Sequence, residues 1–122
     1  MSPEDRKPRS DCLFCRIVGG ELPAKSVFDD DAIVAFHDIA PRSPTHILVI
    51  PKVHIASAAD LTEDDGPLLG RLFGAAARIA REQGIADAGY RLVSNVGRWG
   101  GQTVDHLHIH LMGGRAFDWP PG

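Results

Sequence analysis

The chain has 122 residues, enough for one domain and not comfortably enough for two. Its hydrophobic fraction of 43% and charged fraction of 24% are typical of a globular protein in water. The formal net charge of -3 argues against non-specific binding to nucleic acid or to an anionic membrane. No apolar run approaches the ~20 residues that a membrane-spanning helix needs.

The N-terminal segment, residues 1–11, is polar and mixed in charge, and we predict that it is disordered ahead of one domain over residues 12–122. It lacks the apolar core of a secretory signal, so we expect a cytoplasmic protein. Cys12 and Cys15 follow in a C-x-x-C pattern. In a reducing compartment this spacing favours half of a metal site or a redox pair over a structural disulfide.

The first half of the domain has the pattern of a short helical turn followed by strands. Residues 12–18 suit a helical turn that ends at a Gly-Gly pair. An acidic run over residues 29–31 has the composition of a tight turn between two strands. Strands are predicted in three places: 26–28, 32–36 and 46–50.

One long helix is predicted over residues 63–83, because apolar side chains recur there at helical spacing. Thr62 suits the N-cap with Asp65 in a weak capping box, and Gly84 suits the stop. Two strands follow around a glycine-rich loop at 95–101: 90–94 and 107–112. Two of the connections between strands are short enough for hairpins. We therefore predict an α+β fold, an antiparallel sheet with the helix on one face.

The last predicted strand carries alternating histidines, V-D-H-L-H-I-H-L-M over residues 104–112. Since side chains of a strand alternate between faces, His106, His108 and His110 are predicted on one face. Packing explains three imidazoles in a row poorly. The alternatives are a solvated face without function, and a metal site that uses two of the three rings.

The glycine-rich loop before these histidines favours a phosphate site. Its glycines permit backbone conformations that gather N–H groups around an anion. A neutral imidazole beside such a loop is a good nucleophile toward phosphorus, and water then hydrolyses the intermediate. The chain has no Walker lysine motif and no aspartate-rich magnesium cluster. Neutral donors and imidazolium suit a singly charged phosphodiester-like or phosphoramidate centre.

Several segments together resemble one known family. H-L-H-I-H-L after G-G-Q-T-V resembles the motif of the histidine triad family. A-F-H-D-I, P-T-H-I-L-V-I-P-K and the final W-P-P-G resemble its nucleotide-binding branch, so the resemblance covers nearly all of residues 12–122. It implies a homodimer whose five-stranded antiparallel sheets join, each with one long helix and a short N-terminal helix. It also implies hydrolysis of purine nucleoside phosphoramidates to an amine and an AMP- or GMP-type nucleotide, without an organic cofactor.

The resemblance also implies roles for individual residues. His108 would be the nucleophile that forms a covalent nucleotidyl intermediate, His110 a phosphate contact, and Thr103 a hydroxyl near the leaving group. Asp38 would accept hydrogen bonds from the ribose hydroxyls, and Trp119 would approach the site of the partner subunit. Apolar and polar residues would line the base pocket: Leu13, Phe14, Ile17, Phe36, His37 and Ile39. The phosphate would be held by loop residues: Asn95, Gly101 and Gln102.

Some of these residues have simpler interpretations. Phe14, Phe36 and Ile39 are equally explained as core residues. Asp38 has the position of a turn residue, and Trp119 in its proline-rich tail has the composition of a packing residue.

A zinc site is the further implication of the resemblance, because some microbial members of the wider superfamily hold zinc with paired cysteines and two histidines. By position the ligands would be Cys12, Cys15, His46 and His106, a closed tetrahedral site. A redox pair and two ordinary buried cysteines are the alternatives. His54 has no predicted partner, and we expect it at the surface or in support of another residue.

Two other functions compete with the phosphoramidate hydrolase. One is a dinucleoside polyphosphate hydrolase of the fragile histidine triad type. The other is a nucleotide-binding or zinc-stabilised interaction module with only residual catalysis.

Overall fold

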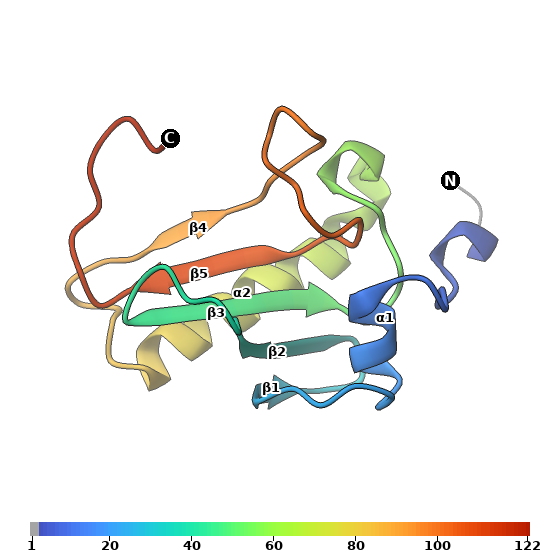
Figure 1. Cartoon of the computed structure of the whole chain (residues 1–122), viewed down its shortest axis with the longest axis horizontal. Helices are drawn as coiled ribbons and strands as arrows, with labels where there is room; N and C mark the ends of the chain where they lie inside the picture. Colours follow the sequence, from blue (N-terminus) through green and yellow to red (C-terminus); the bar gives the residue numbers. More distant parts are fainter. Residues whose placement is uncertain (1–2) are drawn as a thin grey trace.

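A five-stranded antiparallel sheet separates two helical layers in the computed structural model, which describes residues 3–122 (Figure 1). The strand order in the sheet is β1-β2-β3-β5-β4. The strands are β1 (Ser26–Asp29), β2 (Ile33–His37), β3 (Thr45–Pro51), β4 (Arg91–Val93) and β5 (Ile109–Gly113). The helices are α1 (Leu13–Val18) and α2 (Gly66–Glu82), with the 3-10 helices η1 (Pro3–Arg6), η2 (Ala58–Asp60) and η3 (Glu63–Asp65). The predicted α+β fold class is confirmed.

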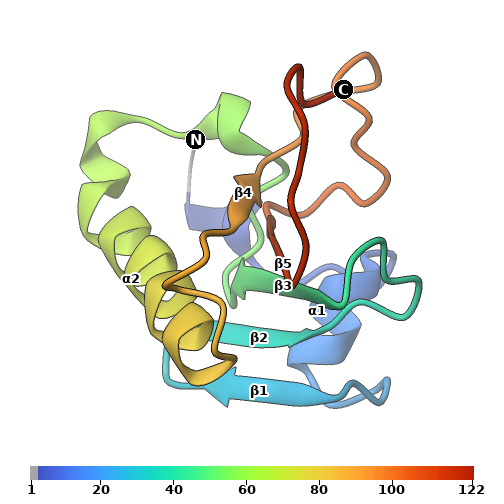
Figure 2. The same cartoon turned by 90° about the vertical axis from the view of Figure 1, so that its left-hand side faces the viewer.

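Alternation along β2 builds the two layers. Ile33 and Ala35 face the larger core, which the apolar stripe of α2 covers. Val34 and Phe36 point the other way, into a smaller core beneath α1. Figure 2 shows α2 and α1 on opposite faces of the sheet. Since α1 has 6 residues and α2 has 17, helix covers much less of this second face than of the first.

The long helix begins at Gly66, three residues later than predicted. The Thr62 N–H donates to Asp65 Oδ2 at 3.0 Å, as expected for the carboxylate half of a capping box. Residues 63–65 form the 3-10 helix η3 instead of a first α-helical turn. Pro67 lies in the first turn of α2, where its missing N–H leaves no bond unmade.

The last strand is shorter than the predicted 107–112, because its ladder with β3 starts where Ile109 pairs with Val49. Leu107 instead donates its N–H to the Ile55 carbonyl at 2.6 Å, outside the sheet. His106 and His108 therefore precede β5, and only His110 of the histidine motif belongs to the strand. The prediction that all three histidines share one strand was wrong on this point.

The N-terminal segment contacts the domain where it is described. Residues 1–2 of the predicted disordered stretch lie outside the described residues. Arg6 makes a two-pronged ion pair with Asp65, at 2.7 and 3.0 Å, and this places η1 beside the start of α2. The His54 N–H donates to the Arg6 carbonyl at 2.8 Å. Composition alone does not predict these contacts. Within residues 3–122 no helix has the length and apolarity to cross a membrane.

Candidate active site

Histidines from three parts of the chain form a connected row across the face that α1 partly covers. The His54 and His106 rings lie 5.1 Å apart between centroids, and the His108 and His110 rings lie 4.9 Å apart. His46 contacts the far end of the row, with its ring 5.2 Å from that of His110. The Phe14 ring lies edge-on to His106 and to His108, which connects the two halves of the row.

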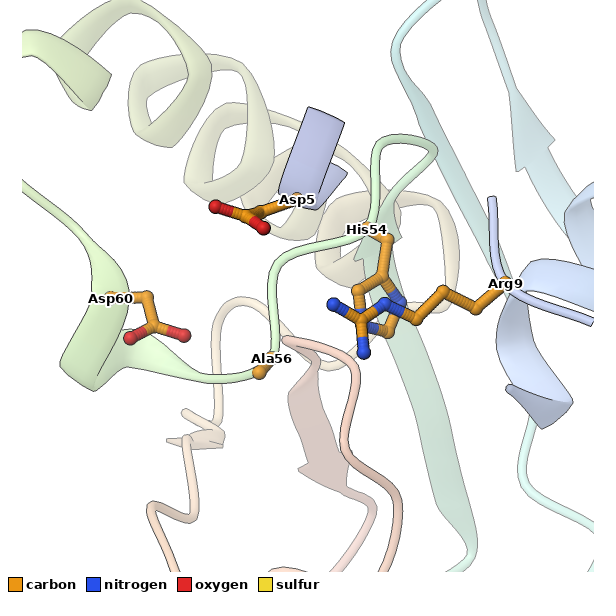
Figure 3. A pocket seen from close by; sticks show the side chains of 5 residues that line it. All are labelled: Asp5, Arg9, His54, Ala56 and Asp60. Carbon is orange, nitrogen blue, oxygen red and sulfur yellow. The ribbon is translucent and has the colours of Figure 1, made fainter. Parts of the chain in front are cut away.

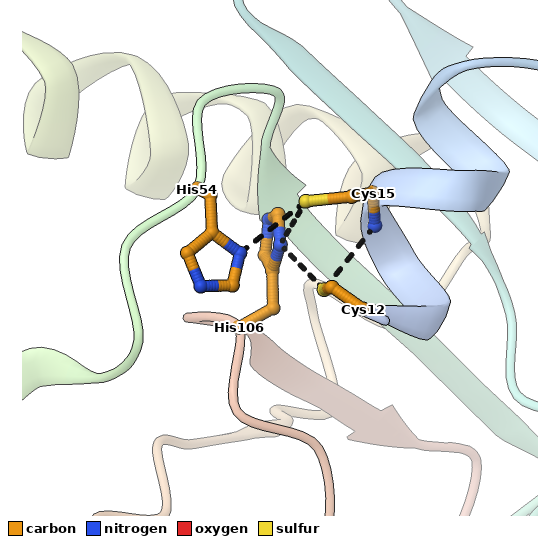
Figure 4. A group of neighbouring side chains, drawn as sticks. All are labelled: Cys12, Cys15, His54 and His106. Carbon is orange, nitrogen blue, oxygen red and sulfur yellow. Dashed lines mark hydrogen bonds between the residues drawn. The ribbon is translucent and has the colours of Figure 1, made fainter. Parts of the chain in front are cut away.

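One end of the row is the cysteine cluster, which consists of Cys12, Cys15, His54 and His106 (Figure 4). All four side chains are buried, and one candidate ligand atom from each lies within 4.8 Å of the others. Cys12 and Cys15 are free thiols. Two sulfurs and two imidazole nitrogens are a donor set that suits Zn²⁺ in a structural site.

The hydrogen of His106 is placed so that a nitrogen lone pair faces the thiols. His106 Nε2 lies 2.8 Å from the Pro51 carbonyl, and since a carbonyl can only accept, Nε2 carries the hydrogen. Nδ1 then presents its lone pair to Cys12 Sγ at 3.4 Å and to Cys15 Sγ at 3.6 Å. Burial lowers the pKa of His106 to about 4, so the ring is neutral at pH 7.

His54 replaces His46 in this cluster, which corrects the ligand set expected from the sequence. His54 is only 4% exposed, and its Nδ1 lies 3.3 Å from Cys15 Sγ. His46 pairs with Met112 near the other end of the β3–β5 ladder and lies away from the thiols. The reason is the antiparallel register, which places residues after Pro51 beside those before Ile109. His54 follows Pro51, the last residue of β3, by only three positions in the sequence. This closeness along the chain was the signal that sequence reasoning missed.

His108 lies buried in the middle of the row and is held by one backbone contact. Its Nδ1 lies 2.6 Å from the His106 carbonyl, so Nδ1 carries the hydrogen and donates it. Nε2 then has a free lone pair. This is the tautomer that a nucleophilic imidazole requires.

The other end of the row is the aspartate cluster, which consists of Asp38, His46 and His110. The Arg42 N–H donates to His46 Nδ1 at 3.0 Å, which leaves the hydrogen of His46 on Nε2. That nitrogen lies 2.9 Å from His110 Nδ1 and 3.4 Å from Asp38 Oδ2, and both can accept. His110 consequently carries its own hydrogen on Nε2. Desolvation lowers the pKa of His46, and it lowers the pKa of His110 to about 4.

Residues expected around the base divide into core and surface positions. Phe14 and Phe36 are buried and pack edge-to-face at 5.5 Å, so both belong to the smaller core. Ile17 packs against that core and is partly buried. Leu13 is 46% exposed and Ile39 is 99% exposed. Two polar residues continue this surface at the end of β2: His37, which is exposed, and Asp38, which is half-buried.

The glycine-rich loop is shaped by its own side chains. Asn95 Nδ2 donates to the Gly100 carbonyl at 2.7 Å, and Gln102 Oε1 accepts from the Gly97 N–H at 2.9 Å. Gly101 has φ of +79°, in the left-handed region that favours glycine. Thr103 follows the loop and is exposed, as is Trp119 near the C-terminus.

Two pockets flank the row of histidines. One, of about 310 Å³, lies beside the aspartate cluster and is lined by His46, His110, Asn95, Arg42, Arg91 and Arg115 among others. The other, of about 330 Å³, lies outside the cysteine cluster and is lined by Asp5, Arg9, His54, Ala56 and Asp60 (Figure 3). Only the first contains residues expected from the sequence to contact phosphate.

Comparison with known proteins gives a consistent result. A model of the HIT domain family matches residues 19–117. The purine nucleoside phosphoramidase of Escherichia coli K12 is 47% identical over 103 residues, which are 84% of this chain and 87% of that protein. An uncharacterised HIT-like protein of Synechococcus elongatus is 50% identical over 92% of this chain and 97% of its own length. A HIT family hydrolase from Legionella pneumophila superposes with a TM-score of 0.90 at 52% identity, covering 92% of this chain and 100% of that one.

Proposed function

This chain belongs to the HIT domain family, and from that premise we propose that it hydrolyses the P–N bond of purine nucleoside phosphoramidates. The products are an amine and a nucleoside monophosphate of the AMP or GMP type. The main support is His108, a buried imidazole whose Nδ1–H is fixed on the His106 carbonyl and whose Nε2 lone pair is free. The similarity to the E. coli purine nucleoside phosphoramidase supports the substrate class.

In the proposed first step His108 Nε2 attacks phosphorus and the P–N bond to the amine breaks. The leaving nitrogen takes up one proton and departs as the neutral amine, while the imidazole becomes a nucleotidyl-imidazolium that keeps its Nδ1–H. In the second step water attacks phosphorus and the bond from Nε2 to phosphorus breaks. Water gives up one proton, so the proton taken up in the first step is returned and His108 is restored.

The aspartate cluster supplies a directed donor in this proposal. Because His110 accepts at Nδ1, its Nε2–H is available to donate to a phosphate oxygen. The lowered pKa of His110 keeps the ring neutral, so it acts as a hydrogen-bond donor and not as a fixed charge. We assign the exposed hydroxyl of Thr103 to the path by which the leaving nitrogen receives its proton.

The nucleoside is proposed to lie at the end of β2 beside α1. Leu13 and Ile39 offer exposed apolar surface for a base, and His37 lies on the same surface. The Asp38 carboxylate accepts from the Ala40 N–H at 2.8 Å, and its remaining lone pairs suit ribose hydroxyls. Asn95, Gly101 and Gln102 are proposed to hold the phosphate through the loop that they shape.

Turnover of an adenosine phosphoramidate tests this function directly. We expect the wild type to release adenosine monophosphate, and His108→Ala to lose about 10⁴-fold or more in kcat. Intact mass after a rapid quench should show one nucleotidyl group on the wild type and none on His108→Ala. Arg78→Gln, on the exposed face of α2, is the matched control and should keep wild-type turnover. An unmodified wild-type chain during active turnover would contradict the covalent route.

The competing functions give different results in the same experiment. Faster hydrolysis of a diadenosine polyphosphate than of the phosphoramidate would favour the dinucleoside polyphosphate hydrolase. Nucleotide binding by the wild type with no turnover of either compound would favour the binding module. Retained binding with lost turnover in His108→Ala is the result expected for the enzyme.

We propose that the cysteine cluster holds a structural zinc ion through Cys12, Cys15, His54 and His106. The neutral tautomer of His106, with Nδ1 facing both thiols, fits this group. When bound, zinc would cross-link the start of α1 to the segments before β5 and after β3. Metal analysis of protein purified without chelator should find about one equivalent of zinc, and less than about half an equivalent would contradict the proposal.

A homodimer in the cytoplasm completes the proposal. Strand β4 lies at one edge of the sheet, where β5 is its one partner strand among the described residues, so a second copy could extend the sheet there. Trp119 is 84% exposed, as expected of a side chain that contacts another subunit. Light scattering should give twice the monomer mass. Two free buried thiols suit a reducing compartment.

A further inference from the structure

Three arginines surround the pocket beside His110 without an acidic partner. Arg42, Arg91 and Arg115 line this pocket of about 310 Å³ together with His46 and His110. Among the side chains of residues 5–122, the ion pairs involve other arginines and lysines, and none of these three. A chain with a net charge of -3 has thus gathered uncompensated positive charge at one place.

Two of these guanidinium groups are held in place by the C-terminal segment, which returns beside β4 and the end of β5 (Figures 1 and 2). Arg115 lies 4.2 Å from the centroid of the Phe117 ring, and Arg91 lies 5.0 Å from the same centroid. Arg115 also donates to the Arg42 carbonyl at 3.2 Å. Arg91 donates to the Asp118 carbonyl at 2.6 Å. Two like charges fixed on one ring repel each other, and a bound anion would remove that repulsion.

The guanidinium groups keep donors for a ligand. Each has five N–H hydrogens, and the contacts to backbone carbonyls use only one or two of them. Among residues 3–122 the Arg42 side chain makes no hydrogen bond and no ion pair, although its backbone N–H and carbonyl are both used. The nearby carboxylate of Asp38 lies against His46. These cations therefore suit a carboxylate or a phosphate, which a guanidinium binds through paired hydrogen bonds.

The pocket lies on the side of the reacting phosphorus where the leaving group would extend. The residues proposed for the nucleoside come from α1 and the end of β2, on one side of β5 in the sheet order. The arginine pocket takes Arg91 from β4 and Arg115 from the C-terminal segment, on the other side, and Arg42 from the loop between β2 and β3. His108 and His110 lie between the two regions. A substrate with its nucleoside beside α1 would extend its leaving group toward the arginines.

We propose that the arginine pocket of Arg42, Arg91 and Arg115 binds an anionic group on the leaving amine. This rests on the proposed phosphoramidate hydrolysis and narrows its substrates to amines that carry a carboxylate or a phosphate. The pocket adds no covalent step. Its arginines hold the far end of the leaving group, and this orients the P–N bond toward His108.

Matched substrates test the proposal. The first pair is the adenosine phosphoramidates of β-alanine and of β-alaninamide, which differ by one charge at nearly equal size. The second pair has 2-aminoethyl phosphate and ethanolamine as leaving groups. We expect the wild type to favour the anionic member by about tenfold or more in kcat/KM, and we expect added salt to reduce the ratio. The pair with the larger ratio distinguishes a carboxylate from a phosphate ligand.

Variants then locate the effect. Arg42→Gln should bring the ratio of the two kcat/KM values toward one, and Arg42→Lys should keep part of it. Arg91→Gln and Arg115→Gln should lower the ratio as well, but Arg42 gives the clearest result because its side chain holds no other part of the described structure through a hydrogen bond or ion pair. Arg78→Gln removes one positive charge from α2 and should leave the ratio unchanged. A ratio that survives in all three pocket variants would overturn the assignment.

Two further outcomes separate this inference from the function on which it rests. If the wild type turns over both members of each pair equally, the pocket does not recognise an anion, and phosphoramidate hydrolysis still stands. If neither member of either pair is turned over, the proposed hydrolysis itself fails.

Discussion

The two ends of the histidine row use similar residues for opposite purposes. In the cysteine cluster the Nε2–H of His106 donates a hydrogen bond to the Pro51 carbonyl, and this leaves the Nδ1 lone pair facing two thiols. In the aspartate cluster His46 accepts a hydrogen bond from the Arg42 N–H at its Nδ1. Its Nε2–H then donates a hydrogen bond to His110 Nδ1, so the lone pair of that nitrogen is occupied. The first arrangement offers nitrogen to a metal, and the second offers N–H to a substrate. The residue types alone do not distinguish these two arrangements. The backbone carbonyl or N–H that each histidine contacts does.

His108 connects the two clusters. Its Nδ1–H is held by the backbone carbonyl of His106, which belongs to the cysteine cluster. Its ring lies 4.9 Å from that of His110, which belongs to the aspartate cluster. The proposed nucleophile therefore lies between the two clusters. The cysteine cluster holds the backbone carbonyl that orients His108, and the aspartate cluster directs the N–H of His110.

The largest expected effect concerns which histidine is a ligand of the proposed zinc ion. We expect His54→Gln to lower zinc affinity by at least about 100-fold and to lower the Tm, because the closed site loses one of four ligands. His46→Gln is the matched control and should retain about one equivalent of zinc. Competition with a chromophoric chelator measures both. Loss of zinc in His46→Gln with retention in His54→Gln would restore the ligand set first expected from the sequence.

A smaller effect is expected on catalysis from the aspartate cluster. His46→Gln should lower kcat about tenfold, because nothing then fixes the hydrogen of His110 on Nε2. Since His46 is a positioning residue, the nitrogen-15 chemical shifts of His110 should move toward a mixture of tautomers. Unchanged His110 shifts with a reduced kcat would show that His46 acts in another way.

The buried histidines should make stability depend on pH in one direction. Their pKa values are lowered from the ordinary 6.5, to about 4 for His106 and for His110. As the pH falls below 6.5, these histidines become protonated in the unfolded chain but stay neutral in the folded chain. The free energy of unfolding therefore decreases. It should therefore fall between about pH 6.5 and pH 4 and change little around pH 7. Urea unfolding of metal-free protein measures this, and a free energy that rises on acidification would contradict it.

The smallest expected effect lies outside both clusters, at the ion pair of Arg6 and Asp65. Arg6→Gln should lower the Tm slightly, since the hydrogen bonds from Arg6 lower the pKa of Asp65 to about 2. Most of this difference should disappear as the pH falls toward 2 and the carboxylate is protonated. Arg16→Gln, which breaks the exposed pair with Glu21, is the control and should leave the Tm unchanged.

The elements themselves were largely predictable, because their signals are local. The alternation in β2, the apolar stripe of α2 and the glycine stops follow from neighbouring residues, and the structure places the elements within a few positions of the predictions. The predicted element boundaries are wrong where a contact with a residue distant in the sequence, or a 3-10 turn, replaces the regular structure. Leu107 leaves the sheet for the Ile55 carbonyl, and η3 replaces the first turn of the long helix.

The sequence by itself determined the fold class and the family, and it indicated the histidine motif as the centre of the candidate site. Periodicity and motif spacing are carried by consecutive residues, and so they can be read without the fold. Only the tertiary structure decided that His54 joins the cysteines, where each imidazole carries its hydrogen, and that three arginines meet beside His110. These features depend on the antiparallel register and on single backbone carbonyls and N–H groups that folding brings together.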